Sequence, residues 1–81
     1  MEDTQILDEI TRMTNQEHEL LHQGEHGGGL DEAQHARLSE LKVEIDRLWD
    51  LLRQRRARRH AGLSPDGAAE RPAAIVEHYE Q

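Results

Sequence analysis

The amino-acid sequence predicts an all-α protein: an antiparallel two-helix hairpin, similar to a coiled coil, with a short C-terminal helical tail. Two long stretches place apolar residues at intervals of three and four, the spacing of one face of an α-helix. A glycine-rich segment separates them, and no run alternates polar and apolar residues as a strand would. With 81 residues, the chain is expected to form a single small domain.

The first helix is predicted over about residues 4–23, with Asp3 or Thr4 as its N-cap. Its apolar stripe consists of Ile6, Ile10, Met13 and Leu20, with Leu7 and Leu21 beside it. A loop is predicted over residues 24–30, where four glycines occur in the six residues from Gly24 to Gly29. Because glycine has no side chain to restrict its backbone, this segment is suited to reversing the chain.

The second helix is predicted over about residues 31–60. Asp31 is a suitable N-cap, and Gln34 stands three residues later, where a capping box requires it. The apolar positions then alternate spacings of three and four, as in a heptad seam: Leu38, Leu41, Ile45, Leu48 and Leu52. Because the loop is short, the two helices are expected to pack antiparallel, and the longer second helix is expected to extend past the first.

Residues 62–81 form the predicted tail. The stretch from Leu63 to Gly67 contains Ser-Pro-Asp-Gly, which favours a turn. Pro72 suits the first position of a short helix over about residues 72–80. The apolar face of that helix would consist of Ile75, Val76 and Tyr79.

The composition predicts a cytoplasmic protein that does not enter a membrane. Cysteine is absent, which excludes disulfides and thiolate metal sites. The N-terminus has no basic start followed by an apolar run, as a secretory signal would. No apolar stretch approaches the roughly 20 residues that span a bilayer. Large apolar residues are few, so we expect a second copy or another protein to contribute to stability.

The charge is unevenly distributed along the chain, although the net charge is −7. Residues 1–36 contain nine acidic residues and one basic residue, whereas residues 37–61 contain eight basic and four acidic residues. Five arginines stand close together: Arg53, Arg55, Arg56, Arg58 and Arg59. They could contact nucleic-acid phosphates. In the alternative interpretation they suit the C-terminal end of a helix and are neutralised by acidic residues of the first helix, within the chain or across a dimer.

His18 to His22 matches the H-E-x-x-H pattern of zinc peptidases. The longer metzincin pattern fails at Glu25 and Gly28, and a hairpin offers neither a strand to align a substrate nor a cleft. We therefore predict no enzymatic activity and no cofactor. His18 and His22, with Glu25 or His26, are candidate ligands for zinc or nickel without catalysis. The alternative is that they are solvated residues beside the apolar stripe.

The predicted interaction surface consists of residues that the seam does not need: Trp49, Leu51, Arg53, Arg55, Arg56, Arg58 and Arg59. Trp49 flanks the seam on one side and Leu51 flanks it on the other. A tryptophan in this position either completes the core or anchors an interface, where tryptophan is enriched among the residues that dominate binding.

Several segments resemble a known family: the run Trp-Asp-Leu-Leu-Arg-Gln-Arg-Arg-Ala from Trp49 to Ala57, the start from Asp3 to Leu7, the stretch from Glu17 to Leu20, and the ending Arg71-Pro72 with Val76 to Tyr79. On these motifs, the chain resembles a family of small actinobacterial proteins catalogued as domain of unknown function 2630 (DUF2630), over essentially its whole length. The resemblance implies a natural protein of a bacterial cytoplasm rather than a fragment. It implies no established activity, cofactor or site residue.

We therefore expect an interaction module. Two hairpins would pair through exposed parts of their seams, or one hairpin would offer that surface to another protein. The alternative is a nucleic-acid or transcription-machinery accessory protein that uses the arginine block from Arg53 to Arg59. The second alternative is metal binding through His18 and His22.

Overall fold

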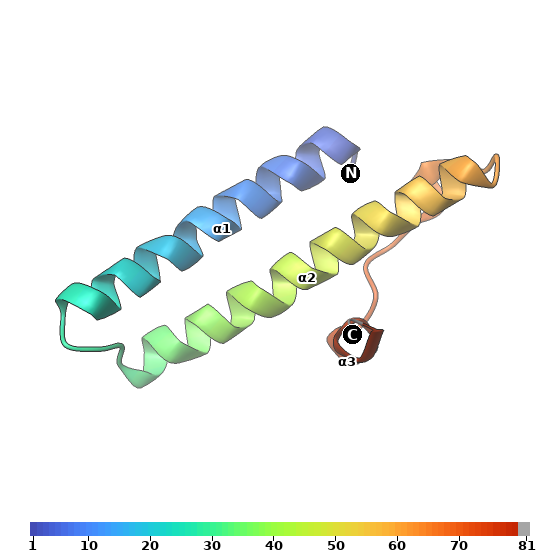
Figure 1. The fold of residues 1–81 in the computed structure, drawn as a ribbon. Helices are drawn as coiled ribbons and strands as arrows, with labels where there is room; N and C mark the ends of the chain where they lie inside the picture. The colour runs from blue at the N-terminus through green and yellow to red at the C-terminus, as the bar shows by residue number, and fades with distance from the viewer. Residues whose placement is uncertain (80–81) are drawn as a thin grey trace.

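The computed structural model describes the backbone of residues 1–79 and the side chains of residues 1–76. This part of the chain contains no strand and four helical elements: α1 (Asp3–His26), α2 (Glu32–His60), the 3-10 turn η1 (Pro65–Gly67) and α3 (Ala73–Tyr79). Figure 1 shows α1 and α2 side by side and antiparallel, with α2 extending beyond the N-terminus of α1. The predicted all-α hairpin with a short C-terminal helix is confirmed.

The N-cap of α1 is Glu2, and not Asp3 or Thr4 as predicted. The backbone N–H of Glu2 donates a hydrogen bond to Gln5 Oε1 at 2.8 Å, which closes the first turn. Asp3 is the first helical residue, and its carboxylate binds arginines of α2 instead of capping its own helix.

The end of α1 lies one turn beyond its predicted position, because the helix continues through Gly24 to His26. A Cβ atom at Gly24 would lie 3.0 Å from the side chain of Leu30, so the missing side chain lets Leu30 fold back against the end of the helix. Gly28 and Gly29 then reverse the chain at φ values of +80° and +111°, in a region that favours glycine.

The start of α2 has the predicted capping box. The N–H of Gln34 donates to Asp31 Oδ1 at 2.7 Å, and the N–H of Asp31 donates to Gln34 Oε1 at 2.9 Å. Both bonds involve residues three apart, so they require no tertiary contact. The helix ends at His60 and is followed by Gly62 at a φ of +74°.

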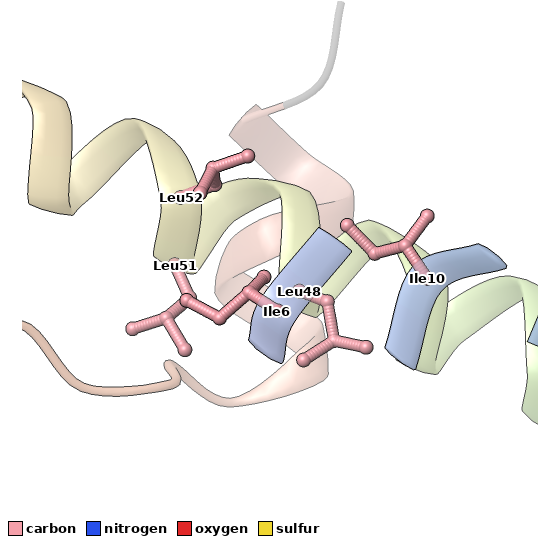
Figure 2. Close-up of a cluster of buried hydrophobic side chains, with 5 residues drawn as sticks. All are labelled: Ile6, Ile10, Leu48, Leu51 and Leu52. Carbon is pink, nitrogen blue, oxygen red and sulfur yellow. The ribbon is translucent and has the colours of Figure 1, made fainter. Parts of the chain in front are cut away.

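The core lies between α1 and α2, where five side chains from both helices pack together (Figure 2): Ile6, Ile10, Leu48, Leu51 and Leu52. Leu38 and Leu41 extend the buried seam toward the loop, and Ile45 is partly buried between them and the cluster. Four of the five predicted seam positions of α2 are thus buried, and the fifth is half-buried. Burial of this stripe holds the hairpin closed.

The tail returns along α2 and places α3 against the middle of that helix, on the side away from α1 (Figure 1). Arg47 Nε donates to the Arg71 carbonyl oxygen at 2.9 Å, which fixes the tail just before α3. Of the predicted apolar face of this helix, Val76 is buried and Ile75 is half-exposed. Tyr79, which was predicted on the same face, lies outside the described side chains.

The two long helices have 24 and 29 residues, lengths that would be sufficient to span a bilayer of about 30 Å. Neither of them is apolar enough to do so, and the same holds for the other helices in residues 1–79.

Candidate interaction surface

The end of the arginine block binds the start of α1. Arg55 Nε donates to Asp3 Oδ1 at 2.6 Å, and Arg59 Nη2 lies 2.6 Å from the same oxygen. Arg55 Nη1 also lies 3.2 Å from Asp66 Oδ1 in η1. The hydrogen bonds from Arg59 and Arg55 lower the pKa of Asp3 to about 2. The predicted neutralisation within the chain therefore occurs, with Asp3 as its main acceptor.

Three of the five arginines are committed to such contacts within the chain. Arg55 is only 5% exposed, so the prediction that it belongs to an exposed surface is wrong. The tail folds over it, and Arg58 Nε donates to the carbonyl oxygen of Ser64 at 2.5 Å in the same turn. Arg53 and Arg56 are exposed and form no hydrogen bond or ion pair within the described residues.

Leu51 was predicted on the same surface, and this prediction is also wrong. Its side chain is 7% exposed and packs in the core cluster with Ile6 of α1. Ala68 of the tail packs against that cluster as well. The position is buried because the tail covers this side of α2.

The two sides of the seam on α2 differ in what covers them. Residues seven apart lie on one side of a helix in a hairpin of this kind. The first side carries Arg37, Glu44, Leu51 and Arg58. Arg37 Nη2 donates to Gln16 Oε1 on α1 at 3.0 Å, and burial together with nearby Glu70 raises the pKa of Glu44. Since Leu51 and Arg58 also have partners, α1 and the tail cover this side over the C-terminal half of α2.

The second side carries Lys42, Trp49 and Arg56, again seven apart, and all three are exposed. Trp49 directly follows Leu48, which is 2% exposed, yet its own side chain is 41% exposed. The alternative that Trp49 completes the core of the chain is therefore wrong.

The exposed apolar residues of α1 lie on this second side too. Leu7 follows the buried Ile6 by one position, and Leu21 lies two heptads further along; both are 43% exposed. In an antiparallel pair, the residues that directly follow the seam residues of each helix lie on the same side of the pair. The residues that directly precede the seam residues lie on the other side, where Arg37 bonds Gln16. Arg53 is also exposed and stands four residues, about one helical turn, after Trp49. We call the set Leu7, Leu21, Lys42, Trp49, Arg53 and Arg56 the Trp49 face.

Two open grooves of about 470 and 520 Å³ flank Arg37 at the loop half of the hairpin, and both are lined by Leu41. Their polar lining includes side chains that also bond one another, as Arg37 does with Gln16 and Glu40. The grooves are gaps over the seam where the tail does not reach, and we assign no ligand to them.

A buried carboxylate that the sequence analysis did not identify holds the tail to α2. Asp50 is 1% exposed and accepts hydrogen bonds from two nitrogens of Arg71, of which Nε lies 2.9 Å from Oδ2. Gln54 Nε2 donates to the same oxygen at 2.9 Å and to the Ala69 carbonyl oxygen at 2.7 Å. The hydrogen bonds from Arg71 lower the pKa of Asp50 in spite of its burial.

The histidines are not grouped as predicted. His22 lies beside His26, with ring centroids 4.3 Å apart, and Glu25 joins them in one exposed cluster. His18 is exposed and does not belong to the cluster. The extension of α1 through Gly24 makes Glu25 and His26 helical instead of part of the loop, which places them beside His22.

The fold and the surface define a small helical-hairpin protein with one open, partly apolar face and a tail over the opposite one. The chain belongs to the family described as Protein of unknown function (DUF2630), whose model matches residues 2–81. It is 40% identical over 77 residues to the uncharacterized protein Rv0898c of Mycobacterium tuberculosis and to the uncharacterized protein Mb0922c of Mycobacterium bovis. Each match covers 95% of this chain and 88% of the relative. No solved structure matches.

Proposed function

We propose that this protein is a protein-binding module that associates with a second copy of itself through the Trp49 face. One observation carries the proposal: Trp49, on a well-formed helix beside a buried seam, leaves 41% of its side chain exposed. A tryptophan contributes about 150–250 Å² of contact area when it is buried, and tryptophan is enriched among the residues that dominate protein interfaces.

The size of the surface supports association. The chain is elongated, with extents of 51 × 25 × 18 Å, and exposes 5580 Å². A compact monomer of 9.3 kDa exposes about 5,000 Å². The larger exposed area is consistent with a hairpin of two helices whose open side is not covered by another described element. Pairing two hairpins would bury Leu7, Leu21 and Trp49 in each copy and would enlarge a small core.

The distribution of charge favours a second copy as the partner. The Trp49 face carries the cations Lys42, Arg53 and Arg56 on α2. Residues 1–36, which include α1, carry nine acidic residues and one basic residue. The α1 helix of a second copy therefore offers the charge opposite to that of the exposed row on α2, which favours encounter and alignment.

Replacing Trp49 by serine should weaken association by about 10–100-fold, because a central tryptophan of an interface contributes about 2 kcal/mol or more. Sedimentation equilibrium over a wide range of protein concentration measures the effect. The substitution should leave the helical circular dichroism of the monomer intact, since the side chain does not belong to the core cluster.

Leu63→Ser is the matched control for this measurement. Leu63 is 53% exposed, lies in the turn after α2 and is not a member of the Trp49 face. It tests whether loss of any exposed apolar side chain reduces association. A wild-type chain that sediments as a monomer throughout, or equal losses in the two variants, would refute the proposal.

Nucleic-acid binding is the second candidate, and one observation favours it: Lys42, Arg53 and Arg56 surround Trp49 as exposed cations that form no salt bridge within the described residues. The charge of Arg53 acts on the Asp50 carboxylate only from a longer distance. Three phosphate contacts would give a log–log salt slope of roughly −2 to −3. Fluorescence anisotropy with a DNA or RNA oligonucleotide should then show binding that Arg53→Ser with Arg56→Ser removes. Arg12→Ser, on α1, is the control for loss of a cation. No binding at low salt eliminates this candidate.

A further inference from the structure

The last turn of α1 brings three side chains with metal-binding groups together. His22, Glu25 and His26 are three and four residues apart, a spacing that places side chains on one face of a helix. One ligand atom from each side chain lies within 4.8 Å of the others. The two imidazole rings are tilted by 59° at a centroid distance of 4.3 Å, so their nitrogens can turn toward a common point without a change in the backbone.

Nothing in the described part of the chain competes for these groups. All three residues are exposed, and none of their side chains forms a hydrogen bond or ion pair within residues 1–76. Convergence of the three groups requires rotation about side-chain bonds only. Their polar atoms exchange contact with water for contact with an ion, and no hydrogen bond or ion pair within the described residues is lost.

The position on the helix adds a favourable field. α1 ends at His26 and is followed by Gly27, so the cluster lies at the C-terminal end, where the unpaired carbonyl groups and the helix dipole favour positive charge. A doubly charged ion gains more from this field than a single imidazolium does.

The ligand set selects the class of ion. Two imidazole nitrogens and one carboxylate oxygen suit Zn²⁺, Ni²⁺, Co²⁺ and Cu²⁺, whereas Ca²⁺ and Mg²⁺ prefer sites made entirely of oxygen. Three protein ligands leave the remaining coordination positions to water. Such a bridge joins residues one turn apart and stabilises the helical turn that precedes the glycine-rich reversal.

From this geometry we propose that His22, Glu25 and His26 form a site for one divalent transition-metal ion per chain at the C-terminal end of α1. The site differs from the predicted pair, because His18 takes no part in it. The ion holds the last turn of α1 in helical form and so strengthens the end of the hairpin opposite to the Asp3 contacts.

Isothermal titration of the full-length chain with Zn²⁺ and with Ni²⁺ tests the proposal, together with thermal melting followed by circular dichroism. The wild type should bind one ion per chain and melt at a higher temperature with the ion than without it. Binding should weaken at acidic pH, because protons compete with the metal ion for the imidazole nitrogens.

His26→Ala and His18→Ala form a matched pair, because each histidine stands four residues from His22. His26→Ala should reduce the affinity at least tenfold, since even a change in a group that only supports a metal ligand costs roughly 10–100-fold. Glu25→Gln should also weaken binding, and His18→Ala should leave it unchanged. Equal losses in the two histidine variants, one ion per two chains, or no heat and no melting shift with the wild type would overturn the site. Trp49→Ser should bind the ion as the wild type does.

Discussion

Replacing Leu48 by alanine should lower the free energy of unfolding by about 2–5 kcal/mol, the range for a buried leucine truncated to alanine. Leu48 is 2% exposed and packs with Ile6 and Ile10, so the cavity would open at the centre of the contact between α1 and α2. A domain of this length has a total stability of roughly 4–12 kcal/mol. The variant should therefore be partly unfolded or unfold at much lower urea concentration, as followed by circular dichroism.

Trp49→Ala is the control for this prediction, because it removes a larger side chain from the adjacent position. At protein concentrations low enough to keep the chain monomeric, it should change the stability far less than Leu48→Ala, since Trp49 lies outside the core cluster. A loss of stability in Trp49→Ala as large as that in Leu48→Ala would contradict the assignment of the two positions to the core and to the surface.

Replacing Arg71 by alanine should lower the free energy of unfolding by about 2–4 kcal/mol, because it leaves a buried carboxylate without its cation. Asp50 is 1% exposed, and after the change Gln54 would be the one described residue that still donates to it. The carboxylate would attract water, and the tail would detach from α2. Urea denaturation measures the loss, and faster hydrogen exchange in the α3 backbone would show that the tail has separated.

The same variant has a defined pH dependence. The hydrogen bonds from Arg71 lower the pKa of Asp50, so this pair stabilises the fold above the ordinary carboxyl pKa of about 3.9 and loses its contribution as the pH falls below it. The difference in stability between the wild type and Arg71→Ala should therefore narrow below that pH.

Two further variants test whether the loss of stability in Arg71→Ala comes from the unpaired Asp50 carboxylate. Arg53→Ala removes a nearby exposed cation and should cost little. Combining Asp50→Leu with Arg71→Met replaces the pair by apolar groups and should recover stability relative to Arg71→Ala. If Arg53→Ala costs as much as Arg71→Ala, the buried pair does not hold the tail.

The features that sequence analysis predicted correctly depend on interactions within one or two helical turns. The capping box of Asp31 and Gln34 joins residues three apart, and the seam from Leu38 to Leu52 follows from periodicity. Gly24 shows where a local rule fails. A glycine there predicts a helix end, but α1 continues through Gly24 to His26, and Leu30 packs where a Cβ atom of residue 24 would lie. The cluster of His22, Glu25 and His26 lies in this added turn.

The Asp50–Arg71 pair had no comparable signal in the sequence. Asp50 lies away from the heptad seam, and a pattern of charged and apolar residues assigns such a position to solvent. Its partner is 21 residues further along the chain, in a segment without long periodicity. The Asp50 carboxylate is buried because the tail packs over it, and the path of the tail cannot be read from a helical repeat in the sequence.

The two long helices, their antiparallel packing and the buried seam follow from local sequence patterns, because apolar stripes and helix caps are encoded at short spacing. The open side of the seam depends instead on where the tail packs. Trp49 and Leu51 flank the seam on opposite sides of α2, and nothing in their spacing distinguishes them. The tail covers Leu51 and Arg55, whereas Trp49, Arg53 and Arg56 are left exposed.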